Sequence, residues 1–440
     1  MSADRSQSGL VTSPGRRLLR LGSLVGRVGV SVAGERALGL LRSGPVAEAR
    51  RLENLIKNAM RVAETLGEMK GAAMKVGQML SLQEGWLPPE VAEILRGLQR
   101  EAPRVPPEVM RYEVEGSLQA PIDKLFAEFD EQAFAAASIG QVHAARLEDG
   151  RRVAVKIQYP AIREIVTADL KNLKRLFKSL LAMIFDADFE PLWEEMRDRL
   201  LEELDYEHEA ENLRTMRQLH EDVAEIVIPK VIDDRSTDRV LTMEFLEGIA
   251  PREAVSDRYD QESRDRWGRV LFEFQIRGLF EHRMLHTDPN FANFSFLEDG
   301  RMVVYDFGSV KRIPGKLAAC YSALLRSVID GRPEEVPEIL RQLGASRGDG
   351  SAVEFELLEP YLDLLADIFS RDSEYRFGED PDLYDRIMQA GMDNWTRATD
   401  LRFPQDVIFV DRSFAGHFGN LMRLGARGPW TEIVERYIGD

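Results

Sequence analysis

The stretch that decides the fold reads His286-Thr287-Asp288-Pro289-Asn290-Phe291-Ala292-Asn293, and Asp306-Phe307-Gly308 follows thirteen residues after Asn293. The apolar run from Met302 to Tyr305 leads directly into Asp306. Asp288, Asn293 and Asp306 all carry hard oxygen donors, which magnesium prefers. Either piece alone is explained as well by ordinary turn residues. Together, at this separation, they predict a magnesium-dependent site.

The spacing is that of a kinase catalytic loop followed by its metal-binding segment. Phosphoryl transfer needs a carboxylate near the attacking oxygen and ligands that hold magnesium on the nucleotide phosphates. We predict that Asp288 takes the first role. Asn293 and Asp306 are the predicted metal ligands.

An alternating segment upstream is typical of a β-hairpin that binds phosphates. Glu148-Asp149-Gly150 is a turn signal, and Arg152 to Gln158 reads as the next strand, which carries Lys156 among apolar residues. In a kinase this lysine reaches the α- and β-phosphates. Small residues before the hairpin would let backbone N–H groups approach the phosphates, although an Ala-rich turn alone is also explained by plain packing. The predicted nucleotide contacts here are Ala135, Ala136, Ala137, Ser138, Ile139, Gly140 and Val142.

Because most of these small residues are Ala rather than Gly, we expect a stiffer loop than a Gly-rich one. Val240 to Phe245 reads as a further apolar strand, ending in Leu246-Glu247-Gly248. A kinase places its hinge here, and the hinge backbone hydrogen-bonds adenine. Glu244 and Leu246 are therefore predicted nucleotide contacts.

A charged helix is predicted from about Leu192 to Leu219. Asp205 and Glu209 lie four residues apart and would share one face of this helix, where like charges repel unless cations lie between them. A kinase needs one glutamate from such a helix to pair with the strand lysine, and we assign Glu209 to Lys156. An acidic run is otherwise simply a solvated face.

Composition describes a soluble globular protein of two or three domains or lobes: 440 residues, 44% hydrophobic and 30% charged. The single cysteine rules out an intramolecular disulfide and fits a reducing compartment. A net charge of −17 argues against generic nucleic-acid binding. Residues 1–50 nevertheless hold eight Arg and three acids, a net charge of +5. This segment is a flexible leader, a segment on an anionic membrane surface, or a cleaved organelle presequence.

No transmembrane helix is predicted, because no apolar run of sufficient length is free of charge. The predicted organisation is a basic leader over 1–45, a helical extension over 46–128, a lobe over 129–248 and a helical lobe over 249–440. The extension contains Lys75-Val76-Gly77-Gln78, in which Gly77 interrupts a helical pattern at a cost of about 1 kcal/mol relative to Ala. Trp267 to Phe280 reads as a buried helix. Residues after Val310 look helical, with breaks near Gly331, Gly344 to Gly350 and Gly378.

These motifs together resemble the UbiB/AarF group of atypical kinases. The signatures are Lys75-x-Gly77-Gln78, the Ala-rich stretch from Ala135 to Val142, Val153-Ala154-Val155-Lys156, Glu203-x-Asp205 and Asp306-Phe307-Gly308. The resemblance covers roughly residues 52–315. It implies an α+β, two-lobed protein-kinase-like fold with the N-terminal helical extension packed over the active site.

The resemblance also implies roles and ligands. Lys75 and Gln78 would point into the site and contact Glu203 and Asp205, in space that a protein substrate would need. Members bind ATP or ADP with Mg²⁺ or Mn²⁺, associate with membranes, and are linked to isoprenoid-quinone biosynthesis and lipid homeostasis. The implied partners are therefore a nucleotide, an isoprenoid lipid or quinone precursor and an anionic membrane surface, with no stable protein substrate.

The catalytic loop departs from the family pattern, which reads His-Ala-Asp-Pro-His-Pro-Gly-Asn. Here Thr287, Asn290, Phe291 and Ala292 replace four of its residues, whereas Asp288 and Asn293 are kept. The changed residues shape the loop and whatever approaches Asp288. We therefore expect nucleotide and metal binding to be retained and substrate choice to differ from the family's usual one.

Three functions compete. The first is an ATPase or a small-molecule or lipid kinase, with Lys156, Glu209 and Asp288 as catalytic residues and Lys75 beside them. The second is a nucleotide-switched protein that extracts or presents lipids without phosphotransfer. The third is a protein Ser/Thr kinase, which the missing Ala-Pro-Glu motif and the Ala-rich loop disfavour. The expected location is cytoplasmic and peripheral to a membrane, with the mitochondrion as the alternative.

Overall fold

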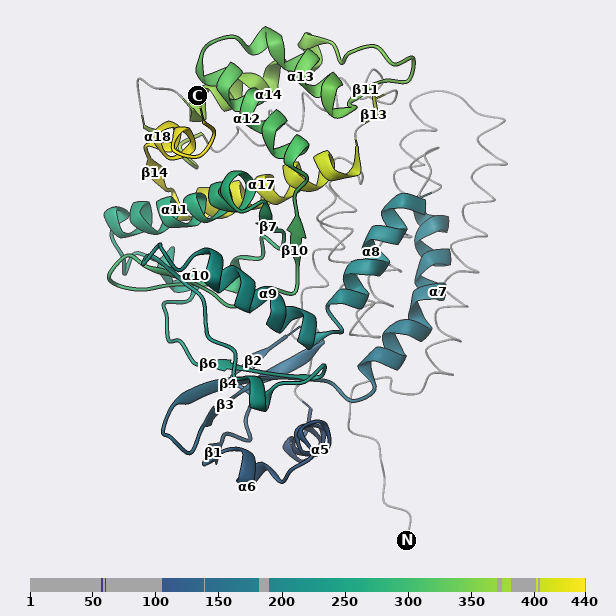
Figure 1. Ribbon diagram of the computed structural model, residues 1–440, viewed down its shortest axis with the longest axis vertical. Coiled ribbons are helices and arrows are strands. Elements are labelled where there is room, and N and C mark those ends of the chain that lie inside the picture. Colours follow the sequence, from purple (N-terminus) through teal and green to yellow (C-terminus); the bar gives the residue numbers. More distant parts are fainter. Residues whose placement is uncertain are drawn as a thin grey trace. The chain divides into compact units, whose positions relative to one another are not determined.

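The computed structural model describes residues 57, 60, 105–137, 139–181, 190–369, 374–380, 401–402 and 404–439 (Figure 1). The basic leader, the residues Lys75, Gly77 and Gln78, and Ser138 lie outside the described residues. The chain divides into two compact units: Met1–His208 with Val231–Phe245, and Glu209–Lys230 with Leu246–Asp440. Residues 209–230, which the sequence analysis placed in the first lobe, cluster with the second unit.

The first unit is built on a five-stranded antiparallel sheet with strand order β1-β3-β4-β6, in which β2 pairs with β3. The predicted hairpin is confirmed, since Gly150 adopts a φ of 87° between β3 and β4. Central β4 is buried along almost its whole length, which explains its apolar sequence. The strands are β1 (Glu128–Phe129), β2 (Ala135–Ala136), β3 (Gly140–Arg146), β4 (Arg152–Gln158) and β6 (Val240–Glu244).

Helix α5 packs its buried Met110 and Val114 in one apolar cluster with Val153, Val155 and other residues of the sheet. Two longer helices, α7 and α8, pack against each other and form a helical hairpin in Figure 1. Helix α7 was not predicted from the sequence. The helical elements of this unit are α5 (Pro107–Leu118), α6 (Ile122–Leu125), α7 (Ile162–Leu181), α8 (Glu190–Glu202) and η1 (Asp233–Arg235).

The single charged helix predicted over 192–219 is wrong. Helix α8 ends at Glu202, and α9 (Tyr206–Leu219) begins after an interruption of three residues. The Asp205 carboxylate accepts hydrogen bonds from the backbone N–H groups of Glu207 and His208, at 3.1 and 3.2 Å. Asp205 is thus the residue that caps α9, a role for which aspartate is well suited. Asp205 precedes the helix, so it does not share a helical face with Glu209.

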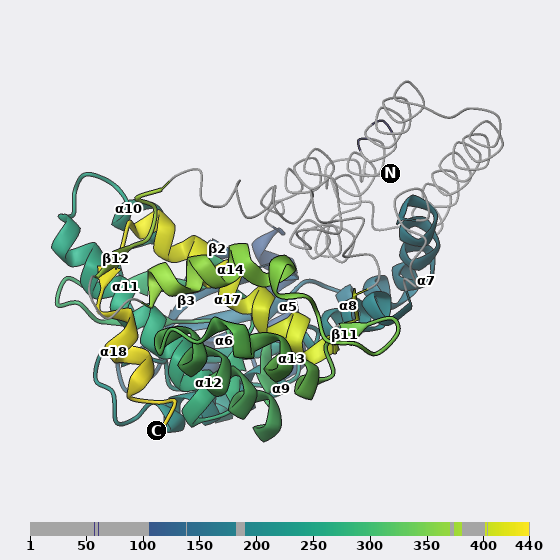
Figure 2. The ribbon, with the colours of Figure 1, turned by 90° about the horizontal axis from the view of Figure 1, so that it is seen from above.

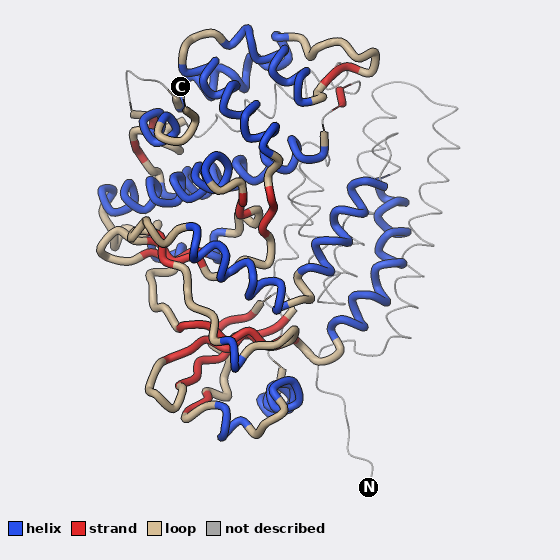
Figure 3. Tube along the Cα trace, viewed as in Figure 1, coloured by secondary structure: helices blue, strands red, loops and turns tan. Residues whose placement is uncertain are grey.

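The second unit holds several small sheets, drawn in red among its helices in Figure 3. In one, β8 and β9 are antiparallel neighbours and β5 pairs in parallel with β9. In another, β7 pairs with β10. The strands are β5 (Ile226–Val227), β7 (Met284–His286), β8 (Phe294–Phe296), β9 (Met302–Val304), β10 (Val310–Arg312), β11 (Ser346–Arg347), β12 (Tyr375–Arg376), β13 (Leu401–Arg402) and β14 (Arg427–Gly428).

Helix α11 is the central helix of the second unit and contacts α17, α18 and β14 (Figures 1 and 2). The predicted buried helix at Trp267 is confirmed, but it begins at Gln261 because Asp260 caps it. It continues into a π-helical turn, η2. The other helical elements are α10 (Pro251–Ala254), α11 (Gln261–Ile276), η2 (Arg277–Glu281), η3 (Phe291–Asn293), α12 (Gly315–Ile329), η4 (Pro333–Glu335), α13 (Val336–Leu343), α14 (Phe355–Ile368), α17 (Gln405–Leu424) and α18 (Trp430–Glu435).

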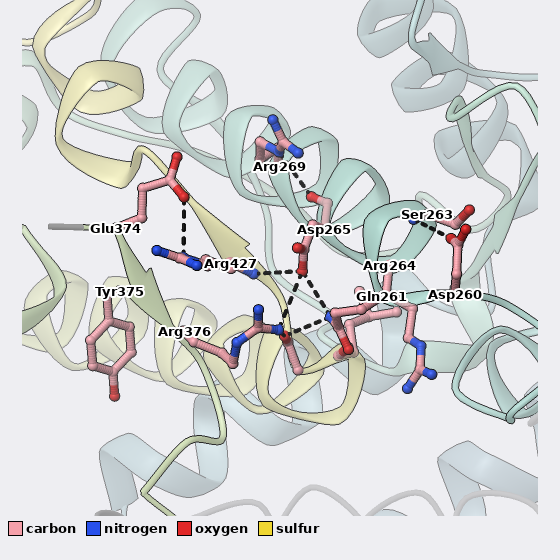
Figure 4. A network of polar contacts seen from close by, with 12 residues as sticks. Asp260, Gln261, Ser263, Arg264, Asp265, Arg269, Glu374, Tyr375, Arg376 and Arg427 are labelled. Atoms are coloured by element: carbon pink, nitrogen blue, oxygen red, sulfur yellow. Dashed lines mark hydrogen bonds and ion pairs between the residues drawn. The ribbon is translucent and has the colours of Figure 1, made fainter.

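A polar network joins the start of α11 to the end of the chain (Figure 4). The Asp265 carboxylate accepts hydrogen bonds from the Arg427 backbone N–H at 2.9 Å and from Gln261 Nε2 at 2.7 Å. Gln261 Nε2 also donates to the Gly425 carbonyl at 2.8 Å. Gln261 thus helps to satisfy the carbonyl end of α17, and Arg376 Nη1 donates to the same Gly425 carbonyl at 3.0 Å. Among the described residues, no helix has the length and hydropathy of a membrane span.

Candidate functional site

Lys156 lies in the middle of β4, opposite Val142 on β3 and Leu241 on β6. It is 7% exposed, and its Nζ lies 5.0 Å from the ring centroid of Tyr206. A nearly buried ammonium is costly unless other groups compensate its charge, and the Tyr206 ring face supplies part of that compensation. Lys156 is thus a nearly buried side chain of the first unit, with its Nζ over the Tyr206 ring.

The Ala-rich stretch forms a tight hairpin against β3. Ala135 and Ala136 pair with Val142 and Gln141, and the Ala137 N–H donates to the Gly140 carbonyl at 2.9 Å. The N–H of Ala137, which we predicted to face the phosphates, is thus already used inside the hairpin. Gly140 is required by close packing, because a Cβ there would collide with the Ile157 carbonyl oxygen.

The predicted partner residues of Lys156 and Lys75 lie around the start of α9. Glu203 and Asp205 fall between α8 and α9, and Asp205 caps α9. Glu209 is 2% exposed within α9. Lys156 and Glu209 belong to different compact units, so their pairing stays a prediction. Lys75 lies outside the described residues, and its pairing with Glu203 or Asp205 also stays a prediction.

The second unit brings together the loop of residues 286–293, which we call the catalytic loop, and the Asp306-Phe307-Gly308 segment. The loop follows β7, and the segment lies between β9 and β10. The Tyr305 N–H donates to the Asn293 carbonyl at 2.9 Å, and Asn293 Nδ2 donates to the Asp288 carbonyl at 3.4 Å. These bonds link Asp288, Asn293 and the residue before Asp306 in one short chain of contacts.

Two further side chains tie the catalytic loop to the Asp306 segment. His286 Nε2 donates to the Asp306 carbonyl at 2.8 Å, which fixes the tautomer with the proton on Nε2. Burial lowers the pKa of His286, so the ring is neutral near pH 7. Thr287 Oγ1 lies 2.8 Å from Ser309 Oγ and donates to the Ser309 carbonyl at 3.1 Å.

The residues that depart from the family pattern have structural roles here. The Asn290 side chain accepts a hydrogen bond from the Ala292 N–H at 3.2 Å and so caps η3. Phe291 is 7% exposed and its ring lies 5.8 Å from that of Phe296. Thr287 supplies the bonds to Ser309. Thr287, Asn290 and Phe291 thus stabilise the loop through contacts of their own. Asp288 and Asn293 keep their places in the family pattern.

The donor set fits a magnesium ion that carries a nucleotide. Because Asn293 Nδ2 faces the Asp288 carbonyl, Asn293 Oδ1 is the oxygen that would bind a metal. Asp306 Oδ1 accepts the Gly308 N–H at 3.0 Å, which orients its carboxylate. Magnesium usually binds one or two protein oxygens and takes its other ligands from phosphates and water. No cluster of three or more His, Cys, Asp or Glu that could hold a metal occurs among the described residues.

Leu246, which follows β6 in the chain and begins a segment of the second unit, is bonded to Tyr305. The Tyr305 hydroxyl donates to the Leu246 carbonyl at 3.0 Å and lies 2.6 Å from Ser295 Oγ. The Phe245 N–H donates to the Arg152 carbonyl at 3.1 Å. Tyr305, the residue before Asp306, thus also bonds Leu246 of the predicted hinge. This role of Tyr305 was not predicted from the sequence, because an aromatic residue at the end of an apolar run is typical of a core residue.

Other supporting residues were also missed. Asn212 is 8% exposed and donates from α9 to the Phe307 carbonyl at 3.0 Å. On α17, Ser413 and Asn420 donate to backbone carbonyls of the catalytic loop. All three lie far in sequence from the backbone carbonyls that they bond. In the sequence, such residues could have been recognised by one feature: a polar side chain on the otherwise apolar face of an amphipathic helix.

Comparison with known proteins agrees with this architecture. The solved structure of the Mycobacterium tuberculosis protein Rv3197 in complex with erythromycin superposes with a TM-score of 0.64 at 28% identity, covering 89% of this chain and 98% of that one. Together with the family match given next, this superposition confirms the predicted α+β, protein-kinase-like fold. The family description "ABC1 atypical kinase-like domain" matches residues 97–340.

The chain belongs to the ABC1 atypical kinase-like family, and the predicted UbiB/AarF membership is confirmed. It is 34% identical over 309 residues to the "Probable serine/threonine-protein kinase abkA" of Dictyostelium discoideum, covering 66% of this chain and 54% of that protein. It is 30% identical over 396 residues to the "Atypical kinase coq-8, mitochondrial" of Caenorhabditis elegans, covering 87% and 51%. The chain thus spans about half the length of these two relatives.

Proposed function

We propose that this protein is an atypical kinase-like enzyme that binds ATP or ADP with Mg²⁺ or Mn²⁺ and hydrolyses ATP or transfers its phosphoryl group to a small lipid-like alcohol. One observation supports this above all: the loop that carries Asp288 and Asn293 is hydrogen-bonded to the segment that carries Asp306. A fixed set of one carboxylate for the acceptor and two oxygens for the metal is what phosphoryl transfer requires.

Each residue has a distinct task in this proposal. Lys156 binds the α- and β-phosphates, and Glu209 orients Lys156. Glu244 and Leu246 offer their backbone to adenine, and the Ala135–Val142 hairpin covers the phosphates. Asn293 and Asp306 hold the metal, which neutralises charge on the transferred phosphoryl group. Asp288 orients the acceptor hydroxyl or water and accepts its proton.

The proposed acceptor is an isoprenoid lipid or quinone precursor, and the proposed place of action is a membrane surface. The family membership supports this assignment, and the basic residues 1–50 suit an anionic surface. The mitochondrial name of the Caenorhabditis elegans relative favours the mitochondrion, the alternative location, over the cytoplasm. Nucleotide, lipid and membrane are thus the proposed partners.

Nucleotide hydrolysis tests the proposal directly. ATP turnover is measured with and without anionic liposomes and a phenolic quinone precursor, for the wild type and for Asp306→Ala. We expect Asp306→Ala to lose at least about a hundredfold in turnover and to lose the thermal stabilisation by MgATP. The matched control is Asp257→Ala, an exposed aspartate of the same unit. Equal turnover of wild type and Asp306→Ala would overturn the proposal.

The second candidate is a nucleotide-switched lipid-binding protein without phosphotransfer. One observation favours it: Asp288 Oδ1 already accepts the Asn290 N–H at 3.1 Å, a structural use of the carboxylate. Asp288→Asn keeps an oxygen for this bond and removes the charge. If Asp288→Asn supports lipid extraction from vesicles while Lys156→Ala and Asp306→Ala do not, the second candidate holds. Loss of function in Asp288→Asn with unchanged nucleotide affinity rejects it.

A further inference from the structure

One face of α17 lies against the catalytic loop. Ser413, Gly416, His417 and Asn420 are spaced so that they lie on the same side of this helix, and we call them the α17 stripe. Ser413 Oγ donates to the His286 carbonyl at 3.0 Å, and Asn420 Nδ2 donates to the Pro289 carbonyl at 2.8 Å. The two anchored carbonyls belong to the residues that flank Thr287 and Asp288.

The middle of the stripe is fitted to the loop by shape. A Cβ placed on Gly416 would lie 2.5 Å from Pro289 Cβ and closer still to Pro289 Cγ. The His417 ring is 6.1 Å from the ring of His286 and 5.7 Å from that of Phe294. Glycine at position 416 is therefore required for Pro289 to approach the helix as closely as it does.

The chemistry of the stripe is unusual for a helix face that packs in a core. Ser413, His417 and Asn420 are each only 2% exposed, although burying a polar side chain costs free energy unless it finds a partner. Apolar residues would pack the same face at no such cost. The serine and asparagine find their partners in backbone carbonyls of the catalytic loop, so their polarity is explained by that loop.

We propose that the α17 stripe positions the catalytic loop, so that α17 sets the placement of Asp288 and Asn293 for the reaction. The inference rests on the proposed function. The stripe touches neither substrate nor metal in this proposal and acts through the His286 and Pro289 carbonyls. It also lies outside residues 97–340, the part of the chain that the family description matches.

A pair of glycine substitutions tests the proposal. Gly416→Ala adds a methyl group against Pro289, whereas Gly419→Ala adds the same group on the same helix with nothing within 4 Å. Both substitutions raise helix propensity equally. We expect Gly416→Ala to lower kcat about tenfold or more, since small displacements of reacting groups are costly, with KM for ATP changed less than about twofold. Gly419→Ala should match the wild type in both constants.

A second substitution checks that the effect passes through Pro289. In a Pro289→Gly background the atoms that Gly416→Ala would meet are absent, so adding Gly416→Ala should leave kcat unchanged. Ser413→Ala and Ser413→Thr form an independent pair, because only threonine keeps a hydroxyl for the His286 carbonyl. We expect a fall in kcat of roughly threefold or more for Ser413→Ala and recovery in Ser413→Thr. Equal kcat in Gly416→Ala and Gly419→Ala, or a full Gly416→Ala defect in the Pro289→Gly background, overturns the proposal.

Amide hydrogen exchange separates this inference from the proposed function. Exchange at residues 286–293 is measured without nucleotide, so it does not depend on any turnover. Faster exchange in Gly416→Ala than in Gly419→Ala supports positioning by α17, and equal exchange rejects it. Turnover that survives Asp306→Ala instead rejects the phosphoryl-transfer function and leaves the exchange result standing.

Discussion

Thr287 bonds the catalytic loop to Ser309, the residue that follows the Asp306-Phe307-Gly308 segment. It is 5% exposed, and its backbone N–H and hydroxyl both bond to Ser309. The alanine usual in the family pattern could make only the backbone bond. The substitution thus adds a tie that keeps the two segments together.

Replacing Thr287 by valine removes this hydroxyl and keeps the shape of the side chain. We expect Thr287→Val to lower the free energy of unfolding by about 0.5–1.5 kcal/mol, because it removes the hydrogen bonds between the Thr287 hydroxyl and the half-buried Ser309. Urea unfolding measures the change. Thr287→Ser, which keeps the hydroxyl, is the control and should lose less. A valine variant as stable as the wild type would show that the tie contributes nothing.

His220 is a residue whose protonation the fold opposes. It is 2% exposed, and its Nδ1–H donates to the Met216 carbonyl at 3.0 Å. Burial is the main cause that lowers its pKa to about 4, and the nearby His282 and Arg277 lower it further while Asp222 acts in the opposite direction. The folded protein therefore holds His220 neutral.

The lowered pKa predicts a pH dependence of stability. The unfolded chain, with a histidine pKa near 6.5, binds the proton first. His220 therefore contributes stability above pH 6.5 that is lost as the pH falls toward 4. Between pH 7 and pH 5 the wild type should lose about 2 kcal/mol more than His220→Gln, in which the amide can still donate to Met216. Urea unfolding at several pH values checks this, and parallel losses would contradict it.

At the scale of elements, the break between α8 and α9 depends on Asp205. Its carboxylate accepts from two N–H groups of the first turn of α9, which would otherwise lack partners. We expect Asp205→Ala to lower the free energy of unfolding by about 1 kcal/mol, and Asp205→Asn to cost almost nothing, because asparagine caps equally well. Thermal unfolding measures both. If alanine and asparagine cost the same, the cap contributes nothing.

The elements that could be predicted were those whose signals are local. Gly150 lies in the turn between β3 and β4, and β4 has the predicted bounds, because the turn signal and the apolar strand pattern lie within a few residues of each other. The break at Asp205 could not be predicted in this way. An aspartate inside a charged helical pattern reads equally well as a solvated face, and only the position of the Glu207 and His208 N–H groups shows that it is a cap.

The residues of the candidate site also divide into those with a local sequence signal and those without one. Asp288, Asn293 and Asp306 could be assigned because their chemistry and spacing lie within one short stretch. Their supports could not, because Asn212 reaches the Phe307 carbonyl across 95 residues of sequence, and Ser413 and Asn420 reach the catalytic loop across 127 and 131 residues. Such contacts are set by tertiary packing, and helical periodicity shows which face is buried without showing what it meets.

At the scale of the whole molecule, the C-terminal segment is part of the core of the second unit. Trp430 is 1% exposed, and its ring lies 5.0 Å from that of Phe272 on α11 and 5.3 Å from that of Phe377. Its Nε1–H donates to the Tyr375 carbonyl at 2.8 Å. The network around Asp265 bonds the same segment to the start of α11 (Figure 4). The predicted helical tail therefore packs on and hydrogen-bonds to α11, the helix that precedes the catalytic loop.

This role predicts that damage at Trp430 destabilises the unit that carries Asp288. We expect Trp430→Ala to lower the free energy of unfolding by about 3–5 kcal/mol, the usual cost of removing a large aromatic side chain from a core. Trp430→Phe keeps the ring contacts with Phe272 and loses the bond to Tyr375, so it should cost roughly 1–2 kcal/mol. Urea unfolding gives both values. Amide exchange at residues 261–276 shows whether α11 is destabilised. A cost below about 1 kcal/mol for Trp430→Ala, with unchanged exchange in α11, would mean that the tail packs on the unit without supporting it.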